Sequence, residues 1–288
     1  MDLQLKGKTA LVLAASKGLG KACAIALAAE GADVVIGARN AETLNAAAEE
    51  IRTAAAANHT AAAANHAATQ GPAAAAHTAA AKVRILTIPV DVRQPEGAAA
   101  IVNATVKEFG KIDILVNNAG GPPFGKFESF DEAAWQSAFE LSLLSTIRFS
   151  RLVIPHMRKT GSGRIINIVS LSVKTFLADS VLSTSLRMGV VGMAKMLSNE
   201  LGPDQITVNN VAPGLILTDR VKDTLPFDSH PGATLEQLLA ERAKDIPLRR
   251  IGRPEELAAM VAFLASPLAG YITGATIQVD GGAVRSPY

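Results

Sequence analysis

The sequence predicts an α/β protein with a doubly wound parallel sheet of about seven strands, arranged in three layers. Two patterns support this prediction. Short apolar runs alternate with longer segments of helical periodicity along nearly the whole chain. The apolar runs are almost continuous, as expected for strands that helices cover on both faces. Ligands of such sheets bind beyond the carboxyl ends of the strands, so the residues that follow each strand are the functional candidates.

The individual elements follow from this alternation. We expect strands at residues 9–13, 33–36, 83–88, 112–116, 164–169, 206–211 and 275–279. We expect helices at residues 19–29, 41–55, 95–109, 130–158, 182–201 and 254–265. Because α/β folds of this length often form one unit, we interpret residues 1–288 as a single domain.

Composition excludes several classes of protein. The formal net charge is +2 and charged residues make up 19% of the chain, which gives no field suited to nucleic acid or a membrane surface. Cys23 is the single cysteine, so no intramolecular disulfide can form, and we expect a small buried residue in a cytoplasmic protein. The apolar run near the N-terminus is interrupted at Ser16, so we predict neither a signal peptide nor a membrane span.

Residues 53–81 interrupt the rhythm and contain 17 alanines in 29 positions. The segment beginning at Thr53 is repeated at Thr60, which indicates a duplicated low-complexity insertion. Alanine favours helix, but the segment offers little to bury, and Gly71-Pro72 should end any helix that forms. The histidines at 59, 66 and 77 are explained by the repeat, and no carboxylate or cysteine joins them, so we predict no metal site.

A glycine-containing loop joins the first strand to the first helix. It is formed by Ser16, Lys17, Gly18, Leu19 and Gly20. The glycines allow a tight turn and a close approach to a pyrophosphate, while the helix N-terminus supplies N–H groups and a positive dipole end. This position between a buried strand and a helix is typical of a Rossmann-type dinucleotide site.

Further motifs follow later strands in order. They are Asp91-Val92, Asn117-Asn118-Ala119-Gly120, Pro213-Gly214 with Thr218, and Asp280-Gly281-Gly282. With the glycine loop, they make the chain resemble the short-chain dehydrogenase/reductase family, especially its 3-oxoacyl-carrier-protein reductase-like branch. The resemblance covers nearly the whole chain outside the insertion. It implies cofactor contacts from Asp91, Val92, Asn118, Ala119, Gly120, Pro213, Gly214 and Thr218. One departure stands at the glycine loop, where Leu13-Ala14 replaces the family's Thr-Gly.

The charges after the second strand favour NADP(H) as the cofactor. NAD-selective sites place an acid about 20 residues after the glycines. Gly37-Ala38-Arg39-Asn40 has none, and Arg39 could bind a 2′-phosphate in a forked geometry. Lys17 adds a second positive charge nearby. The alternative interpretation is that both cations are solvated surface residues.

The catalytic residues implied by the resemblance are only partly present. The family reduces carbonyls with a Ser that binds the carbonyl oxygen, a Tyr that delivers the proton, a Lys four residues later and an Asn on the preceding long helix. Ser170 matches the Ser, with Ser172 as a close substitute. Ser183, Arg187 and Ser142 stand at the Tyr, Lys and Asn positions.

This substitution leaves the source of the proton open. An unactivated Ser hydroxyl is a poor acid near neutral pH, and a guanidinium rarely gives up its proton. Water held by Ser170, Ser183 and Arg187 is one candidate donor, and Lys174 is another. Arg187 would anchor an anionic or strongly polarised carbonyl group, or the cofactor ribose; a surface-facing helix cation is the alternative.

Two functions remain in view. One is an NADP(H)-dependent oxidoreductase acting on a small carbonyl or alcohol substrate. The other is a non-catalytic NADP(H)-binding protein, either a sensor or a partner subunit. Residues 219–246 are predicted to form a mobile helical lid, with residues 121–125 as a second rim of the pocket and His230 as a solvated residue. The resemblance also implies a homotetramer, or a dimer, assembled through the helices at 130–158 and 182–201.

Overall fold

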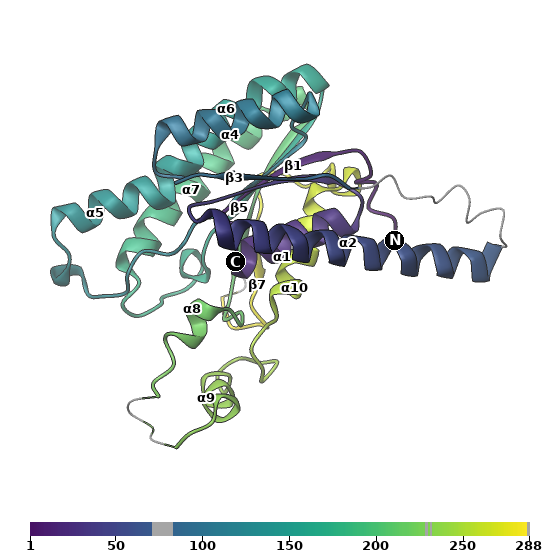
Figure 1. The fold of residues 1–288 in the computed structure, drawn as a ribbon. Coiled ribbons are helices and arrows are strands. Elements are labelled where there is room, and N and C mark those ends of the chain that lie inside the picture. The colour runs from purple at the N-terminus through teal and green to yellow at the C-terminus, as the bar shows by residue number, and fades with distance from the viewer. Residues whose placement is uncertain (71–82, 228–229, 231, 287–288) are drawn as a thin grey trace.

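The computed structural model describes residues 1–70, 83–227, 230 and 232–286, and its centre is a seven-stranded parallel sheet (Figure 1). The strand order is β3-β2-β1-β4-β5-β6-β7. The chain builds the sheet outward from β1 to one side and then, from β4 on, to the other side, so the topological switch point lies between β1 and β4. The strands are β1 Thr9–Leu13, β2 Asp33–Ala38, β3 Ile85–Pro89, β4 Ile114–Asn117, β5 Gly163–Ile168, β6 Ile206–Pro213 and β7 Thr276–Val279. The Rossmann-type doubly wound sheet expected from the sequence is confirmed.

Helices cover both faces of this sheet. They are α1 Gly18–Ala29, α2 Ala41–Gln70, α4 Pro95–Phe109, α5 Glu132–Phe139, α6 Ser145–Thr160, α7 Val181–Glu200, α8 Asp219–Lys222, α9 Leu235–Arg242 and α10 Pro254–Ala265. Alternate side chains of β1 point to opposite faces of the sheet and pack in different cores. Ala10 and Val12 belong to the core with α1, α2 and α10, whereas Leu11 and Leu13 belong to the core with α4, α6 and α7. Helices α8 and α9 extend away from the sheet (Figure 1).

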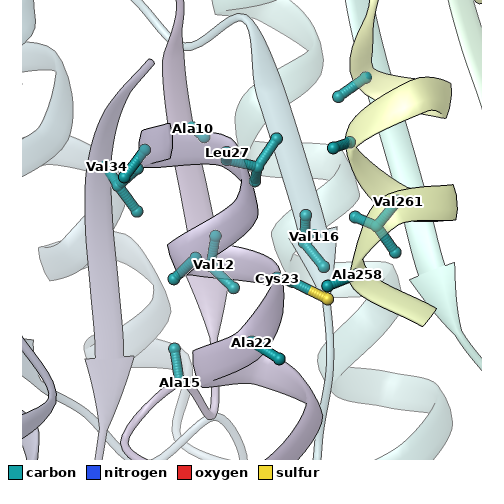
Figure 2. Packing of buried hydrophobic residues seen from close by; sticks show 14 of the residues in the cluster. Ala10, Val12, Ala15, Ala22, Cys23, Leu27, Val34, Val116, Ala258 and Val261 are labelled. Carbon is teal, nitrogen blue, oxygen red and sulfur yellow. The ribbon is translucent and has the colours of Figure 1, made fainter. Parts of the chain in front are cut away.

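Small side chains let α1 lie close to the sheet and to α10 (Figure 2). Ala22 and Cys23 of α1 and Ala258 and Val261 of α10 are all buried in this core. Cys23 is fully enclosed, and burial raises the pKa of its thiol to about 12. The thiol therefore stays protonated and unreactive at neutral pH.

The alanine-rich insertion begins as a continuation of α2. The helix expected at 41–55 runs on to Gln70, because alanine has the highest helix propensity and nothing interrupts the backbone before Gly71. In Figure 1 this end of α2 projects past the edge of the sheet. The rest of the insertion, including His77, lies outside the described residues.

The prediction of one regular helix at 130–158 was wrong, because this segment forms two helices joined by a π-helical turn. Helix α5 begins after Asp131, whose carboxylate caps Ala134 N–H at 2.8 Å, and it ends at Phe139. A π-helical turn at Glu140–Leu144 then leads into α6. The wider turn accommodates one extra residue, which apolar periodicity does not reveal, and such turns often occur at functional sites.

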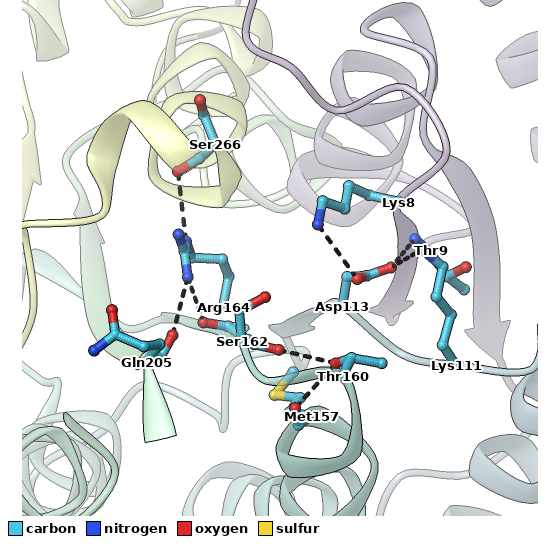
Figure 3. A network of polar contacts seen from close by, with 11 residues as sticks. Lys8, Thr9, Lys111, Asp113, Met157, Thr160, Ser162, Arg164, Gln205 and Ser266 are labelled. Carbon is cyan, nitrogen blue, oxygen red and sulfur yellow. Dashed lines mark hydrogen bonds and ion pairs between the residues drawn. The ribbon is translucent and has the colours of Figure 1, made fainter. Parts of the chain in front are cut away.

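A polar network fixes the amino ends of the strands, on the edge opposite the candidate site (Figure 3). The buried carboxylate of Asp113 accepts a hydrogen bond from Thr9 N–H at 2.8 Å. Lys111 and Lys8 lie 3.0 and 3.6 Å from the same carboxylate. Nearby, Arg164 donates to backbone carbonyls, including that of Ser266. Asp113 thus joins the start of β1 to the start of β4.

Among the described residues, no helix combines the length and apolar character needed to cross a membrane. Over the same ranges, no three His, Cys, Asp or Glu side chains gather in a way that would hold a metal ion.

We expect Asp113→Ala to lower the free energy of unfolding by about 2–4 kcal/mol, because it leaves Thr9 N–H buried without an acceptor and removes the partner of two lysines. Urea denaturation followed by circular dichroism would measure the loss. Asp113→Asn is the matched control: it keeps an oxygen acceptor for Thr9, so its free energy of unfolding should fall by less. Equal midpoints for the wild type and the Ala variant would refute this role for Asp113.

Candidate active site

A cleft of about 670 Å³ opens at the carboxyl ends of the strands. Its walls come from the loops after β4, β5 and β6, from α7 and from the α8–α9 segment. Of the residues expected at the site, the cleft is lined by Leu19, Asn118, Ala119, Ser170, Ser183, Arg187, Pro213, Gly214 and Thr218. The fold therefore brings together residues that are almost 200 positions apart in the sequence.

The glycine loop has a shape suited to an anion. Gly18 has a φ of +57°, which favours glycine. A Cβ at Gly20 would lie 2.5 Å from Ala14 O and 2.7 Å from Asn118 Nδ2, so only glycine fits there. Lys17, at the N-cap of α1, makes no capping bond through its side chain. The first N–H groups of α1 are therefore available to a bound phosphate.

Ala14 carries backbone strain at the start of this loop. Its φ is +48°, in the left-handed region that a Cβ disfavours. The substitution of the family's glycine by alanine has thus left the backbone path in the conformation that suits glycine. The carbonyl of Ala14 faces Asn118 Nδ2, 3.4 Å away, and Asn118 Nδ2 also donates to Leu13 O at 3.2 Å.

Close contacts fix the other loops around the cleft. A Cβ at Gly214 would lie 2.6 Å from Asp280 Cα, so the loops after β6 and β7 touch through backbone. Thr218 lies over the glycine loop, with its Cγ2 3.6 Å from the Cβ position of Gly18. Of the remaining residues expected to bind cofactor, Ser16 is partly buried, Val92 is buried and Gly120 is exposed.

A ladder of buried side-chain amides crosses the sheet just below the cleft. Asn117 Nδ2 donates to Asn167 Oδ1 at 2.8 Å, and Asn167 Nδ2 donates to Asn210 Oδ1 at 2.9 Å. Asn210 Nδ2 then donates to Thr276 Oγ1 at 3.0 Å. These residues pair in register on β4, β5, β6 and β7. The ladder leaves one acceptor unused, Asn117 Oδ1.

Asn117 also lines a small cavity of about 10 Å³, which has room for about one water molecule. Asn117, Ser142 and Arg187 line it. Asn117 Oδ1, Ser142 Oγ and Arg187 Nε are buried and have no hydrogen-bond partner in the described part of the chain. Ser142 reaches the cavity from the π-helical turn. One bridging water could satisfy all three atoms.

The serines divide between the two cavities. Ser170 follows β5 and lines the cleft, and its Oγ lies 3.0 Å from Ser172 Oγ. Ser183, in the first turn of α7, also lines the cleft. Ser142 lines only the small cavity. The hydroxyls of Ser170 and Ser183 can therefore meet a substrate, whereas Ser142 lies behind Arg187.

Arg187 lines both cavities and is partly buried. Its Nη1 donates to Val169 O, which holds the guanidinium against the end of β5. Burial, together with the nearby charge of Arg220, lowers the pKa of Arg187 to about 10. The side chain is thus charged at neutral pH, and it has no carboxylate partner among the described residues.

The charges at the edge of β2 and β3 differ in their pairing. Arg39 is exposed, and it makes no hydrogen bond or ion pair with another described residue. Asp91 is engaged by Arg93, with Nη2 to Oδ2 at 2.6 Å. The Arg93 guanidinium lowers the pKa of Asp91, and the charge of Arg39 adds to this effect. Arg39 is therefore free to meet an anion.

Comparison with known proteins now places the chain. Residues 51–284 match a family model described as enoyl-(acyl carrier protein) reductase, and residues 8–70 match one described as short chain dehydrogenase. The chain belongs to the short-chain dehydrogenase family. The resemblance inferred from its motifs is thereby confirmed.

Several members of the family are similar over their full length. The 3-oxoacyl-[acyl-carrier-protein] reductase of Vibrio cholerae is 36% identical, over 97% of this chain and 98% of the relative. The 7alpha-hydroxysteroid dehydrogenase of Escherichia coli is 31% identical, over 99% and 97%. The crystal structure of L-sorbose reductase from Gluconobacter frateurii, complexed with NADPH and L-sorbose, superposes with a TM-score of 0.87 at 32% identity, covering 99% of this chain and 100% of that one.

No described tyrosine or lysine side chain of this short-chain dehydrogenase lines the cleft. Tyr271 is fully exposed, and Tyr288 lies outside the described residues. Lys174 caps a short 3-10 helix and is not part of the cleft wall. His230 is exposed, and its Nδ1 lies 3.1 Å from Pro226 O. Arg187 is a basic residue that lines the cleft together with the Ser170 and Ser183 hydroxyls.

Sequence reasoning missed two sets of residues at the site. Arg220 lines the cleft but was included only as part of the expected lid, because an arginine after Thr218 has no recognisable motif. The amide ladder of Asn117, Asn167 and Asn210 was missed because it depends on strand register. Asn117 and Asn167 do occupy equivalent places near the ends of β4 and β5, which was the available signal.

We expect Ala14→Gly to raise the free energy of unfolding by about 0.5–1 kcal/mol, because glycine adopts positive φ without the Cβ clash. Chemical denaturation would measure the gain. The matched control is Ala15→Gly, at a buried neighbour without positive φ, which should lose stability through added freedom of the unfolded chain. A loss of stability in both variants would contradict the argument from strain at Ala14.

Proposed function

We propose that the protein is an NADP(H)-dependent oxidoreductase that transfers a hydride to or from a carbonyl or alcohol substrate, with a proton-delivery site that lacks tyrosine. The observation that carries this proposal is the joining of the glycine loop, Ser170, Ser183 and Arg187 in one cleft. Support also comes from the NADPH complex of the sorbose reductase and from the reductases among the relatives.

The residues present fit a dinucleotide, because the Cβ-free cradle at Gly20 and the uncapped start of α1 suit a pyrophosphate. Arg39 would hold the 2′-phosphate, with Asp91 beside it at the adenine end. The nicotinamide half would lie against Asn118, Pro213 and the loop that contains Thr218. When bound there, the reduced cofactor supplies the hydride.

Side chains of the cleft would then bind the substrate carbonyl oxygen, stabilise its charge and hold the water that protonates it. The hydroxyl of Ser170 donates a hydrogen bond to the substrate carbonyl, and Ser172, 3.0 Å away, can support or replace it. Arg187 supplies positive charge where negative charge develops on that oxygen. The proton comes from water held by Ser183 and Arg187, next to the small cavity that Ser142 and Asn117 line.

A second candidate is a non-catalytic NADP(H)-binding protein, acting as a sensor or as a partner subunit. The observation in its favour is that Ser183, Arg187 and Ser142 all differ from the family's catalytic residues. A positioned general acid contributes about 10²–10⁴ in rate, so its loss alone could silence the enzyme.

We also propose roles for the outlying parts. Residues 219–246, which contain α8 and α9, act as a lid over the cleft of a single-domain protein. Homotetramer or dimer contacts would use α6 and α7, where Met188 and Met196 are exposed. Gly192 has open space around its Cβ position, which allows a partner helix to approach, whereas Gly189 packs on Leu143 within the chain.

We expect NADPH to bind at least tenfold more tightly than NADH, because Arg39 can pair with the 2′-phosphate. Arg39→Ala should weaken NADPH binding by about 10–100-fold and leave NADH binding nearly unchanged. Fluorescence titration with both cofactors measures this. Arg52→Ala, which removes another exposed arginine, is the control. An equal loss of affinity for NADPH and NADH would show that Arg39 does not bind the 2′-phosphate.

We expect turnover of NADPH with at least one compound from a panel of 3-oxoacyl thioesters, diketones, quinones and aldehydes. Arg187→Ala should reduce kcat at least tenfold. Arg187→Lys keeps the charge and should therefore have a higher kcat than Arg187→Ala. Because the charged form of Arg187 exists below its pKa of about 10, activity that needs this charge should fall as the pH rises through 10.

The decisive control is NADPH binding in the same preparation. Tight binding without turnover over the whole panel would favour the non-catalytic candidate. Failure to bind either dinucleotide would refute both.

A further inference from the structure

The cleft carries an excess of positive charge that the transfer of a hydride does not require. Arg187, Arg220 and Arg242 all line it, and Asp179 is the one carboxylate in the described cleft wall. None of the three arginines forms an ion pair with a described carboxylate. By contrast, Arg84, Arg93, Arg158 and Arg250 elsewhere in the chain do form such pairs.

Arg220 is built into a fixed position. Its Nη1 donates to Gly121 O at 3.0 Å and its Nη2 to Pro122 O at 2.7 Å. Its guanidinium carbon lies 5.1 Å from the centre of the Phe124 ring. A Cβ at Gly121 would lie 2.7 Å from Nη2, so this position is open only because the residue is glycine. The guanidinium keeps further N–H groups for a ligand.

Arg220 and Ser170 line the same cleft, in segments that follow neighbouring strands. Arg220 begins in α8, which follows β6, and reaches the loop that follows β4. Strand β5 lies between these two strands, and Ser170 follows it. Arg220 therefore joins the two loops that flank the loop of Ser170, within the cleft where a substrate carbonyl would meet that serine.

Arg187 approaches the same place from α7. Its Nη1 donates to Val169 O, one residue before Ser170, and no hydrogen bond of its Nη2 is found in the described part of the chain. Both arginines line the same cleft, and the charge of Arg220 adds to burial in lowering the pKa of Arg187. Two like charges held together in a partly buried cleft, with unused donors, are stabilised by a shared anion.

We propose that Arg220 and Arg187 form a carboxylate subsite, so that the substrate is an oxo acid whose carbonyl meets Ser170. The subsite deepens the proposed function and rests on it. The apolar wall formed by Phe124, Leu171 and Leu177 leaves room for the rest of the substrate. Arg242 bonds to Thr224 Oγ1 at 2.7 Å and adds positive charge to the same wall.

A cofactor phosphate is the competing ligand for Arg220. The glycine loop that suits the pyrophosphate follows β1, whereas Arg220 is fixed on the loop after β4 and its ring contact is with Phe124. These contacts favour the substrate. The experiment below measures the dinucleotide separately, so that the two ligands give different results.

The test uses protein loaded with NADP⁺, which cannot reduce an added ketone. The probes are three pairs of acid and methyl ester: benzoylformate, 3-oxobutanoate and 4-oxopentanoate, each with its own ester. Isothermal titration gives both affinities. We expect at least one acid to bind about tenfold or more tightly than its ester, as hydrogen bonds to a charged group predict.

Variants then assign the discrimination to Arg220. Arg220→Gln should remove at least tenfold of the preference for the acid, with affinities for the ester and for NADP⁺ unchanged. Arg220→Lys, which keeps the charge without the fork, should be intermediate. Arg151→Gln, at an exposed arginine on α6, is the control. A purely structural role for Arg220 would weaken acid and ester equally.

Besides an equal weakening of acid and ester, two results would overturn the subsite. One is the absence of any preference for an acid in all three pairs. The other is an Arg220→Gln variant that loses affinity for NADP⁺, which would assign Arg220 to the cofactor. Failure of the wild type to bind NADP⁺ refutes the proposed function instead, and the same acid and ester titrations on the nucleotide-free protein then decide the subsite alone.

Discussion

The buried amide ladder that crosses β4, β5, β6 and β7 is the constraint around which the site is arranged. Buried polar groups must find partners, and here each amide finds one on the next strand only when the strands keep their register. A slip of one residue would turn these amides to the other face of the sheet. The ladder therefore fixes the relative heights of the strand ends, and with them the loops that contain Ser170 and Pro213. Its unused acceptor is on Asn117, which also lines the small cavity.

Charge is distributed unevenly over the molecule. At the amino ends of the strands, the buried carboxylate of Asp113 is matched by two lysines and a backbone N–H. At the carboxyl ends, Arg187 and Arg220 have no such match among the described residues. Arg187 is the more enclosed of the two, and Arg220 is exposed. An unpaired charge that is partly removed from water, as at Arg187, lowers stability, and proteins retain such a cost where function needs it. The positive φ of Ala14 is a second cost at the same edge.

The sequence was sufficient for features set by local pattern. The parallel sheet follows from apolar runs buried on both faces, and the glycine loop follows from the conformational needs of Gly18 and Gly20. Features that depend on tertiary geometry were missed. The π-helical turn at Ser142 adds one residue without changing composition, and the bonds of Arg220 to residues 121 and 122 join segments about 100 positions apart. The extent of α2 was underestimated because a helix without large apolar residues has no periodic signal.

These observations bear on how a hydride transfer could proceed without tyrosine. A tyrosine gives a proton to the oxygen as negative charge develops there, whereas fixed guanidinium groups stabilise that charge without giving a proton. Under the proposed function, Arg187 would lower the energy of the charged oxygen, and water beside Ser183 could supply the proton afterwards. A carboxylate bound between Arg187 and Arg220 would neutralise part of their charge and weaken that stabilisation. The two roles are compatible only if the arginines have donors to spare, as both guanidiniums do after their bonds to backbone carbonyls.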